Sequence, residues 1–347
     1  GIDPYVAYVF SNTGGFVTIN FTHNCVDPVI TVTSVCGDPI IFTVNNTGGA
    51  MLIAQPYSIT QGVTVVDSGT INIPASGSTT VTLPAGINPY LPYVFSSSGA
   101  FVSVASITHD CADPIITVTS VCGDPIVFTV TNNGADMLIA QPYTVTQGAN
   151  TVASGTINLA AGGTTTITLP TGIDPYAPYV LNNTGGFVPV NYTHDCANTD
   201  ITVTSVCGDP IVFTVTNNGA AMILAQDYTV TQGATTVDSG TLNLAAGAST
   251  TITLPTGIDP YLPYVFSNNG GFITFNYTHD CANPAITVTS VCGDPIVFTV
   301  TNNGGDMYID QPYAVTQGAT TITTGTLNLA SGGSTTITLP TGIDPYV

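Results

Sequence analysis

Cysteine is the residue type with the most chemistry to offer in this chain. Eight cysteines recur in two motifs, Thr-His-Asx-Cys and Val-Cys-Gly-Asp-Pro. Regular, even cysteine usage without a catalytic pattern is typical of disulfides formed in an oxidising compartment. The sequence therefore predicts an extracellular or cell-surface protein whose cysteines are paired.

The pairing can be argued from distance. Cys25 and Cys36 are close in sequence, but the segment 29–35 between them is expected to be an extended strand. Seven extended residues span roughly 23 Å, whereas a disulfide needs Cα atoms within about 7 Å. Pairing across a whole domain is favoured instead, with the first and last strands side by side and their C-terminal ends together. The predicted disulfides are Cys36–Cys111, Cys122–Cys196 and Cys207–Cys281, with Cys25 and Cys292 left to pair with neighbouring units.

Histidine always stands two residues before a cysteine, at positions 23, 109, 194 and 279. A His-x-Cys pair can be half of a metal site. With the thiols committed to disulfides, however, a polar residue at the end of a strand is the favoured interpretation. The Cys-x-x-Cys-His motif that attaches haem is absent from the sequence.

Aspartate recurs before proline, and carboxylates are ligands that calcium prefers. The alternative is that Asp-Pro simply initiates a turn. We expect no other cofactor. The candidates for calcium are the aspartates of Cys-Gly-Asp-Pro, namely Asp38, Asp124, Asp209 and Asp294.

Catalysis has little support in this sequence. No Gly-x-Ser-x-Gly elbow occurs, and paired carboxylates would need a unique cleft that a near-perfect repeat does not offer. We therefore expect a protein that is not an enzyme.

Charge excludes further classes of partner. The chain has no Lys or Arg and a net charge of −20, so it cannot neutralise phosphate, and we expect no nucleic-acid binding. It also has no apolar run long enough to predict membrane insertion. Sequons that permit glycosylation stand at Asn20, Asn45, Asn182, Asn191 and Asn276.

A repeat organises all of these motifs. Gly-Ile-Asx-Pro-Tyr begins at residues 1, 86, 172, 257 and 342, a step of 85 or 86 residues. Within one unit, Val, Ile and Phe alternate with Thr and Ser between turns rich in Gly, Asn and Pro, which is typical of strands. In the second unit the pattern predicts about seven strands, near 115–121, 126–130, 137–146, 151–159, 164–169, 176–181 and 187–196.

These strands predict an all-β fold, a tandem array of immunoglobulin-like β-sandwich domains of about 85 residues. Propeller blades and β-helix coils are disfavoured because their repeats are much shorter. If the predicted disulfides set the domain boundaries, segment 1–27 supplies the last strands of a preceding unit. Segment 283–347 is then a unit that lacks its last strands and is completed by a neighbour. Complete units are predicted at 28–112, 113–197 and 198–282.

The strand-and-turn motifs resemble those of a known family. The relevant segments are Phe128-Thr-Val-Thr-Asn-Asn-Gly134, Ser154-Gly-Thr-Ile-Asn-Leu159 and 161–170. They resemble the CARDB/DUF11-type immunoglobulin-like repeats of prokaryotic surface proteins, and the resemblance covers every unit. It implies a long secreted surface protein and specifies no activity.

Taken together, these features predict a structural role. We expect a subunit of an extracellular filament that self-associates end to end with identical units, its two end segments completing each other by strand donation. The alternative is an extender stalk of a large bacterial or archaeal surface adhesin. A glycan-binding module would instead need an exposed aromatic patch, for which Tyr90, Tyr93, Tyr176 and Tyr179 are the candidates.

Overall fold

The computed structural model describes residues 2–99, 102, 104–183 and 185–343. They form two compact units. The first comprises Gly1–Val121, Ile126–Pro170 and Pro178–His194, and the second Cys122–Pro125, Thr171–Ala177 and Asp195–Val347. Strands β1–β16 therefore belong to the first unit and β17–β28 to the second.

Alternation of apolar and hydroxyl side chains explains why these segments form strands. In β11 (Val127–Asn132) the side chains of Phe128, Val130 and Asn132 are buried, while the residues between them are partly exposed. Successive side chains of a strand point to opposite faces, so this pattern places one face in a core. Threonine suits the other face because β-branched side chains fit a pleated surface.

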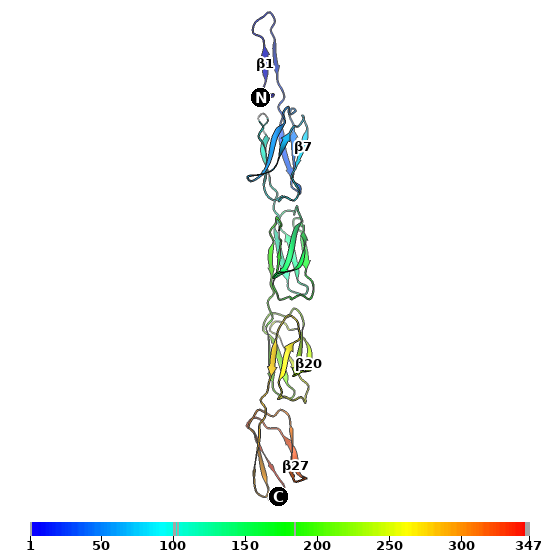
Figure 1. Cartoon of the computed structure of the whole chain (residues 1–347), viewed down its shortest axis with the longest axis vertical. Coiled ribbons are helices and arrows are strands. Elements are labelled where there is room, and N and C mark those ends of the chain that lie inside the picture. Colours follow the sequence, from blue (N-terminus) through cyan, green and yellow to red (C-terminus); the bar gives the residue numbers. More distant parts are fainter. Residues whose placement is uncertain (1, 100–101, 103, 184, 344–347) are drawn as a thin grey trace. The chain divides into compact units, whose positions relative to one another are not determined.

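The first unit contains a hairpin and two sandwiches (Figure 1). In each sandwich a three-stranded sheet packs against a four-stranded one, and every pairing is antiparallel. The hairpin is β1 (Tyr8–Ser11) with β2 (Asn20–His23). The three-stranded sheet of the first sandwich has the strand order β3 (Ile30–Val35), β4 (Ile41–Asn46), β7 (Ser78–Thr82). Its four-stranded sheet has the order β6 (Thr64–Ile71), β5 (Gln55–Gln61), β8 (Tyr93–Ser97), β9 (Val104–His109). In the second sandwich the three-stranded sheet has the order β10 (Ile116–Val121), β11, β14 (Thr164–Thr168). The four-stranded sheet has the order β13 (Asn150–Ile157), β12 (Gln141–Gln147), β15 (Tyr179–Asn182), β16 (Asn191–His194).

The second unit contains one sandwich of the same kind and one that differs. The complete one, the third sandwich of the chain, has a three-stranded sheet of order β17 (Ile201–Val206), β18 (Val212–Asn217), β21 (Ser249–Thr253). Its four-stranded sheet has the order β20 (Thr235–Leu242), β19 (Gln226–Gln232), β22 (Tyr264–Asn268), β23 (Asn276–His279). The other has β24 (Ile286–Val291), β25 (Val297–Asn302), β28 (Ser334–Thr338), and a two-stranded sheet of β26 (Gln311–Gln317) and β27 (Thr320–Leu327). In the described part of the chain, β26 therefore has one pairing edge unused.

The core of each complete sandwich lies between its two sheets. In the third sandwich Phe213 and Phe266 face each other from opposite sheets with ring centroids 5.4 Å apart, and both are fully buried. This architecture confirms the predicted all-β array of immunoglobulin-like sandwiches. Within the described residues, no helix reaches the length and apolar character that crossing a membrane requires.

The first and last strands of a sandwich lie next to each other, as predicted, although they belong to different sheets. β3 pairs with β4, and β9 pairs with β8. They meet at the edge of the sandwich through side chains, where His109 Nδ1 and Ser34 Oγ are 2.8 Å apart. The C-terminal ends of the two strands are nevertheless close, which is what pairing of their cysteines requires.

Candidate functional site

Three disulfides join the two sheets of the complete sandwiches. Their Cα–Cα distances are 5.9, 6.0 and 6.1 Å, within the normal range for a disulfide. Each closes a loop of 74 or 75 residues. The pairs are the ones that strand length favours: Cys36–Cys111, Cys122–Cys196 and Cys207–Cys281.

A buried histidine lies against the disulfide in the first and third sandwiches. His279 Nε2 is 3.0 Å from Cys281 Sγ, and His279 Nδ1 is 2.7 Å from Ser205 Oγ. Phe213 packs edge-on against the same imidazole, with the centroids 5.7 Å apart. His109 makes the equivalent contacts in the first sandwich, to Cys111, Ser34 and Phe42.

Burial governs the charge of these imidazoles. Desolvation lowers the pKa of His109 and of His279, against a smaller raising effect from the neighbouring Asp110 and Asp280. The neutral imidazole is thus favoured, and it links the first strand to the last. The disulfide sulfurs beside it carry no thiolate, the form in which cysteine binds zinc, so these Cys–His groups do not form the donor set of a zinc site.

The aspartates predicted as calcium ligands have a definite partner. Asp38 Oδ1 accepts a hydrogen bond from the Gly86 N–H at 2.7 Å, and Gly86 has a φ of 80°, which favours glycine. Asp124, Asp209 and Asp294 accept in the same way from Gly172, Gly257 and Gly342. Among the described residues, none of the four shares a cluster of three or more His, Cys, Asp or Glu ligands. Calcium prefers six to eight oxygens, so calcium binding here stays a prediction, while the carboxylates hold the glycine of Gly-Ile-Asx-Pro-Tyr in place.

The Asx-Pro-Tyr turn positions a tyrosine. Asn88 Oδ1 accepts from the Tyr90 N–H at 3.1 Å, and Asp174 Oδ1 accepts from the Tyr176 N–H at 3.0 Å. Asn and Asp therefore serve equally in this turn, which explains why Asn88 can stand where the other units have Asp. The second tyrosine of the motif, Tyr93, donates to the Asn88 carbonyl at 2.9 Å and is buried in its own sandwich.

The turn tyrosine reaches the backbone of the following repeat. The Tyr90 hydroxyl accepts from the Leu138 N–H at 2.7 Å, and the Tyr176 hydroxyl accepts from the Ile223 N–H at 2.8 Å. Leu52 and Tyr308 donate in the same way to Tyr5 and Tyr261, both at 2.7 Å. One hydrogen bond thus recurs at every repeat of the motif for which the partner is described.

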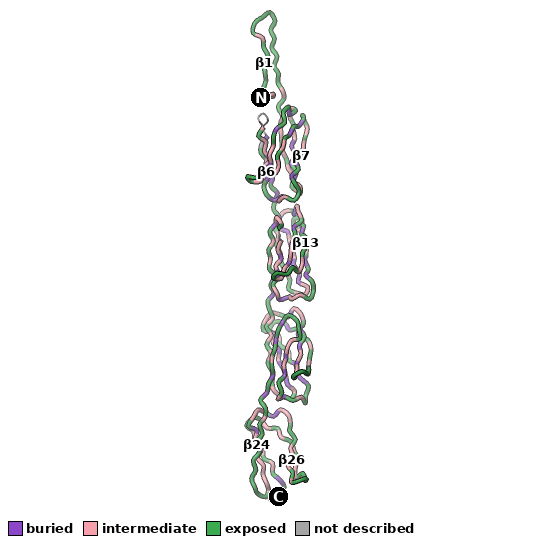
Figure 2. Tube along the Cα trace, in the orientation of Figure 1, coloured by how far each residue is buried: buried purple, intermediate pink, exposed green. Residues whose placement is uncertain are grey.

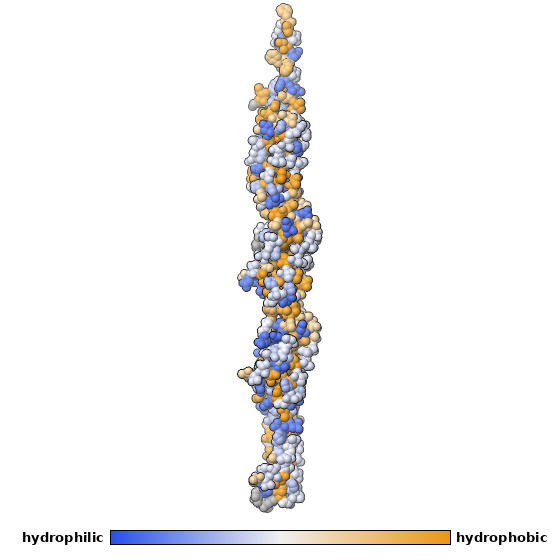
Figure 3. Space-filling model, turned by 90° about the vertical axis from the view of Figure 1, so that its right-hand side faces the viewer, coloured by the Kyte–Doolittle hydropathy of each residue, from blue (hydrophilic) through white to orange (hydrophobic). Residues whose placement is uncertain are grey.

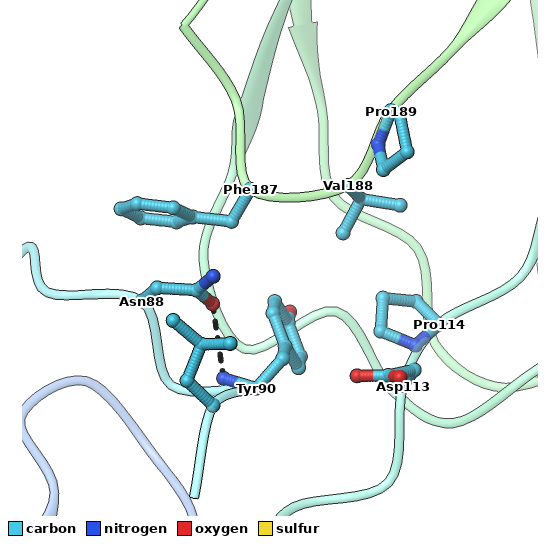
Figure 4. A pocket seen from close by; sticks show the side chains of 8 residues that line it. Asn88, Tyr90, Asp113, Pro114, Phe187, Val188 and Pro189 are labelled. Atoms are coloured by element: carbon cyan, nitrogen blue, oxygen red, sulfur yellow. Dashed lines mark hydrogen bonds between the residues drawn. The ribbon is translucent and has the colours of Figure 1, made fainter. Parts of the chain in front are cut away.

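A hollow of about 250 Å³ lies beside Tyr90 in the first unit. The ring of Tyr90 points toward Phe187 and Val188, with Asn88 and Pro114 on either side (Figure 4). In the second unit Tyr176, Asn198 and the segment 272–274 line an equivalent hollow of about 320 Å³. The tyrosines considered for glycan binding do not form an exposed aromatic patch, because all four are buried: Tyr90, Tyr93, Tyr176 and Tyr179.

One functional residue that the sequence did not reveal is the first asparagine of Asn-Asn-Gly. Asn217 is fully buried, and its Nδ2 donates to the carbonyls of Ala220, Leu244 and Ala245 at 2.7, 3.2 and 3.3 Å. Its Oδ1 accepts from Gly219 N at 3.0 Å and from Asp200 N at 3.3 Å. Asn46, Asn132 and Asn302 repeat this network. The Asn-Asn-Gly motif predicts a turn, but it does not predict that the side chain of its first asparagine joins three loops.

The remaining chemistry lies in two free cysteines. Cys25 is half-buried after β2 and Cys292 is exposed after β24. Each stands at the position that a disulfide cysteine occupies in the complete sandwiches. His23 Nε2 already lies 3.2 Å from Cys25 Sγ, as His279 does from Cys281.

No family model matches the chain, so the CARDB/DUF11-type resemblance stays a prediction. No curated protein matches it either. Among solved structures, a tetra-tandem repeat from the extending region of a large adhesion protein has 16% identity and a TM-score of 0.26, covering 91% of this chain and 92% of that one. Chicken CNTN1 FN1–FN3 domains have 11% identity and a TM-score of 0.21, with coverages of 73% and 98%. Sidekick-1 immunoglobulin domains 1–5 have 13% identity and a TM-score of 0.25, with coverages of 78% and 65%.

Proposed function

We propose that this chain is a structural subunit of an extracellular filament built from disulfide-stapled immunoglobulin-like domains of the CARDB/DUF11 type. The observation that carries the proposal is that every complete sandwich repeats the same two links, a disulfide between its sheets and a tyrosine hydrogen-bonded to the following repeat. Such arrays gain stability from each unit and from its contacts with the next.

The chemistry of the chain supports a structural role over catalysis. Its disulfides belong to an oxidising compartment, and its buried histidines are bound to Ser hydroxyls next to those disulfides. The same groups recur in each repeat, so none is set apart as a reactive centre. On this proposal the protein has no cofactor and associates with copies of itself, without nucleic acid or membrane insertion. Sequons on exposed residues such as Asn20 and Asn191 permit glycosylation.

The second candidate function is an extender stalk of a large adhesin. It uses the same stapled sandwiches as spacers that hold a separate binding domain away from the cell. The disulfides and the tyrosine contacts serve this role equally well. The two functions differ in what surrounds the array, because a filament is made of repeats alone and a stalk carries a divergent terminal domain.

Negative-stain electron microscopy of the purified chain tests the proposal. A filament subunit is expected to give uniform fibres under oxidising conditions, with a periodicity of about one sandwich length. Particles that stay separate at all concentrations would contradict the filament and favour the stalk. Reduction with a thiol is the control, since it opens the disulfides and should weaken the fibres.

A further inference from the structure

We infer that the open sandwich of β24–β28 accepts the β1–β2 hairpin of a second copy of this chain, and that Cys25 and Cys292 form the disulfide that locks the pair. The inference rests on the proposed function and deepens it by naming the partner surface. Three sandwiches of the same chain contain this arrangement within one copy, so the expected contacts can be specified residue by residue.

The hairpin has the surface of a strand pair that belongs in a core. Its register pairs Tyr8 with His23 and Phe10 with Phe21, as β22–β23 pairs Tyr264 with His279 and Phe266 with Tyr277. Phe266 is fully buried, whereas the equivalent Phe10 is 66% exposed. Figure 2 shows the β1–β2 hairpin exposed, and Figure 3 shows hydrophobic side chains over it. A two-stranded hairpin is marginally stable by itself, so a binding partner is expected.

The β24–β28 sandwich has the complementary defect. A groove of about 310 Å³ opens between its sheets, lined by Val288, Phe298, Tyr313, Val315 and Ile337. The equivalents Phe213 and Val230 are fully buried in the third sandwich, but Phe298 and Val315 are partly exposed. A groove this apolar, beside an unused strand edge, suits a β-strand that adds to the sheet.

The third sandwich supplies the register of the added strand. There β19 pairs with β22, setting Val230 opposite Phe266 and Thr231 opposite Val265. β26 differs from β19 only at Pro312 and Ala314, and its edge facing away from β27 is unpaired among the described residues. The same register sets Val315 opposite Phe10 and Thr316 opposite Val9 of the second copy.

The same register brings the free cysteine and the histidine of the hairpin next to the free cysteine of the acceptor sandwich. In the third sandwich Ser205 bonds His279, and Cys207 bonds Cys281. The equivalents are Ser290 with His23 and Cys292 with Cys25. Both cysteines are free in a single copy, and His23 Nε2 beside Cys25 Sγ can take up the thiol proton.

The disulfide step balances with a low-molecular-weight disulfide as oxidant. The Cys25 thiol loses its proton and the thiolate attacks the small disulfide, releasing one small thiolate that takes up a proton. The Cys292 thiolate then attacks the Cys25 sulfur of the mixed disulfide and releases the second. Two protein thiols are oxidised and one small disulfide is reduced to two thiols.

The tip of the hairpin provides an independent match. In the second and third sandwiches a buried glutamine accepts from a tip phenylalanine, Gln141 Oε1 from Phe187 N at 2.6 Å and Gln226 Oε1 from Phe272 N at 3.2 Å. The equivalent Gln311 is exposed and lines a hollow of about 500 Å³. Phe16 at the hairpin tip is fully exposed. Phe16 of the second copy is therefore expected to donate its N–H to Gln311.

The donated segment begins after residue 6. Residues 1–6 and 342–347 have the same sequence, Gly-Ile-Asp-Pro-Tyr-Val. Tyr5 is already bonded to Leu52 of its own copy. The donor's residues 2–6 therefore hold the junction, and residues 7–25 enter the partner.

The test mixes two full-length variants that cannot link to themselves in the expected way. Cys25→Ser retains only the acceptor cysteine, and Cys292→Ser retains only the donor cysteine. After incubation with oxidised glutathione, non-reducing electrophoresis and mass spectrometry of peptic fragments should show a heterodimer linked between Cys25 and Cys292. Adding Phe10→Asp to the donor should lower the yield about tenfold or more, since it places a charge in the apolar groove.

Val63→Asp is the matched control, because Val63 is likewise an exposed apolar residue but lies in the turn between β5 and β6. It should leave the yield unchanged, and both aspartate variants should melt as the parent does. Homodimers linked through one cysteine type, a yield indifferent to Phe10→Asp, or a wild-type monomer with an internal Cys25–Cys292 link would each overturn the inference. Fibres without the Cys25–Cys292 link would also overturn it while leaving the proposed function intact. Linked chains that stay short in micrographs would support the inference and contradict the filament.

Discussion

At the scale of residues, a few buried polar side chains fix the geometry of each sandwich. A fully buried asparagine joins three loops, and a buried histidine joins the first strand to the last beside the disulfide. Within the described residues, no buried side-chain nitrogen or oxygen lacks a hydrogen-bond partner. Buried polar groups are costly when unpaired, so these residues should be sensitive to substitution and to pH.

The buried histidines predict that the sandwiches lose stability in mild acid. Burial lowers the pKa of His109 and His279 in the folded protein, whereas the unfolded value is about 6.5. As the pH falls below 6.5, the unfolded chain therefore binds protons that the folded chain does not, and the free energy of unfolding decreases. Thermal melts at pH 7.5 and pH 5.0 should show a lower Tm at pH 5.0, before aspartates titrate.

The matched variant for this prediction is His109→Gln with His279→Gln. Glutamine keeps hydrogen-bonding capacity but does not titrate, so the fall in Tm between the two pH values should shrink. An unchanged fall in the double variant would show that other groups are responsible.

The asparagine network gives a sharper contrast between adjacent residues. Asn217→Ala leaves buried carbonyls and an N–H without partners, and should cost about 3 kcal/mol of unfolding free energy. Asn218→Ala removes one exposed hydrogen bond to Thr202 and should cost less than about 1 kcal/mol. Urea denaturation of both variants measures the difference. Equal costs would mean that the network does not hold the loops.

Elements were more predictable than the residues that connect them. The alternation around 126–130 and 164–169 predicted β11 and β14 to within a few residues, because side-chain period and turn residues are local signals. The roles of Asn217 and of Asp38 were not predictable, since their partners lie 27 and 48 residues away. The sequence also did not reveal that β3 and β9, although neighbours, belong to different sheets, because sheet membership depends on the whole sandwich.

Stapling of the two sheets predicts where stability is lost on removing a disulfide. Replacing Cys207 and Cys281 by serine opens a loop of 74 residues, worth about 4 kcal/mol in the chain-entropy model. Hydrogen exchange should show faster opening confined to β17–β23, because repeat domains contact mainly their neighbours. Cys25→Ser is the control and should change nothing in a single copy, since Cys25 is free there. Loss spread evenly over all sandwiches would contradict independent stapling.

At the scale of the whole molecule, the described residues form three complete sandwiches, a separate hairpin and one sandwich that lacks a strand pair. The hairpin exposes Phe10 and Phe16, and the β24–β28 sandwich exposes a groove and an unused edge of β26. Each part has what the other lacks, including one free cysteine. These two parts are the basis of the proposal that copies of the chain continue one another as repeats of a single array.

Electron cryo-microscopy of assembled fibres tests this account most directly. The account predicts that every sandwich along the fibre has seven strands, with β1 of one copy paired to β26 of the next and density joining Cys25 to Cys292. A fibre in which β24–β28 remains a five-stranded sandwich, with the edge of β26 unpaired and both cysteines free, would contradict it.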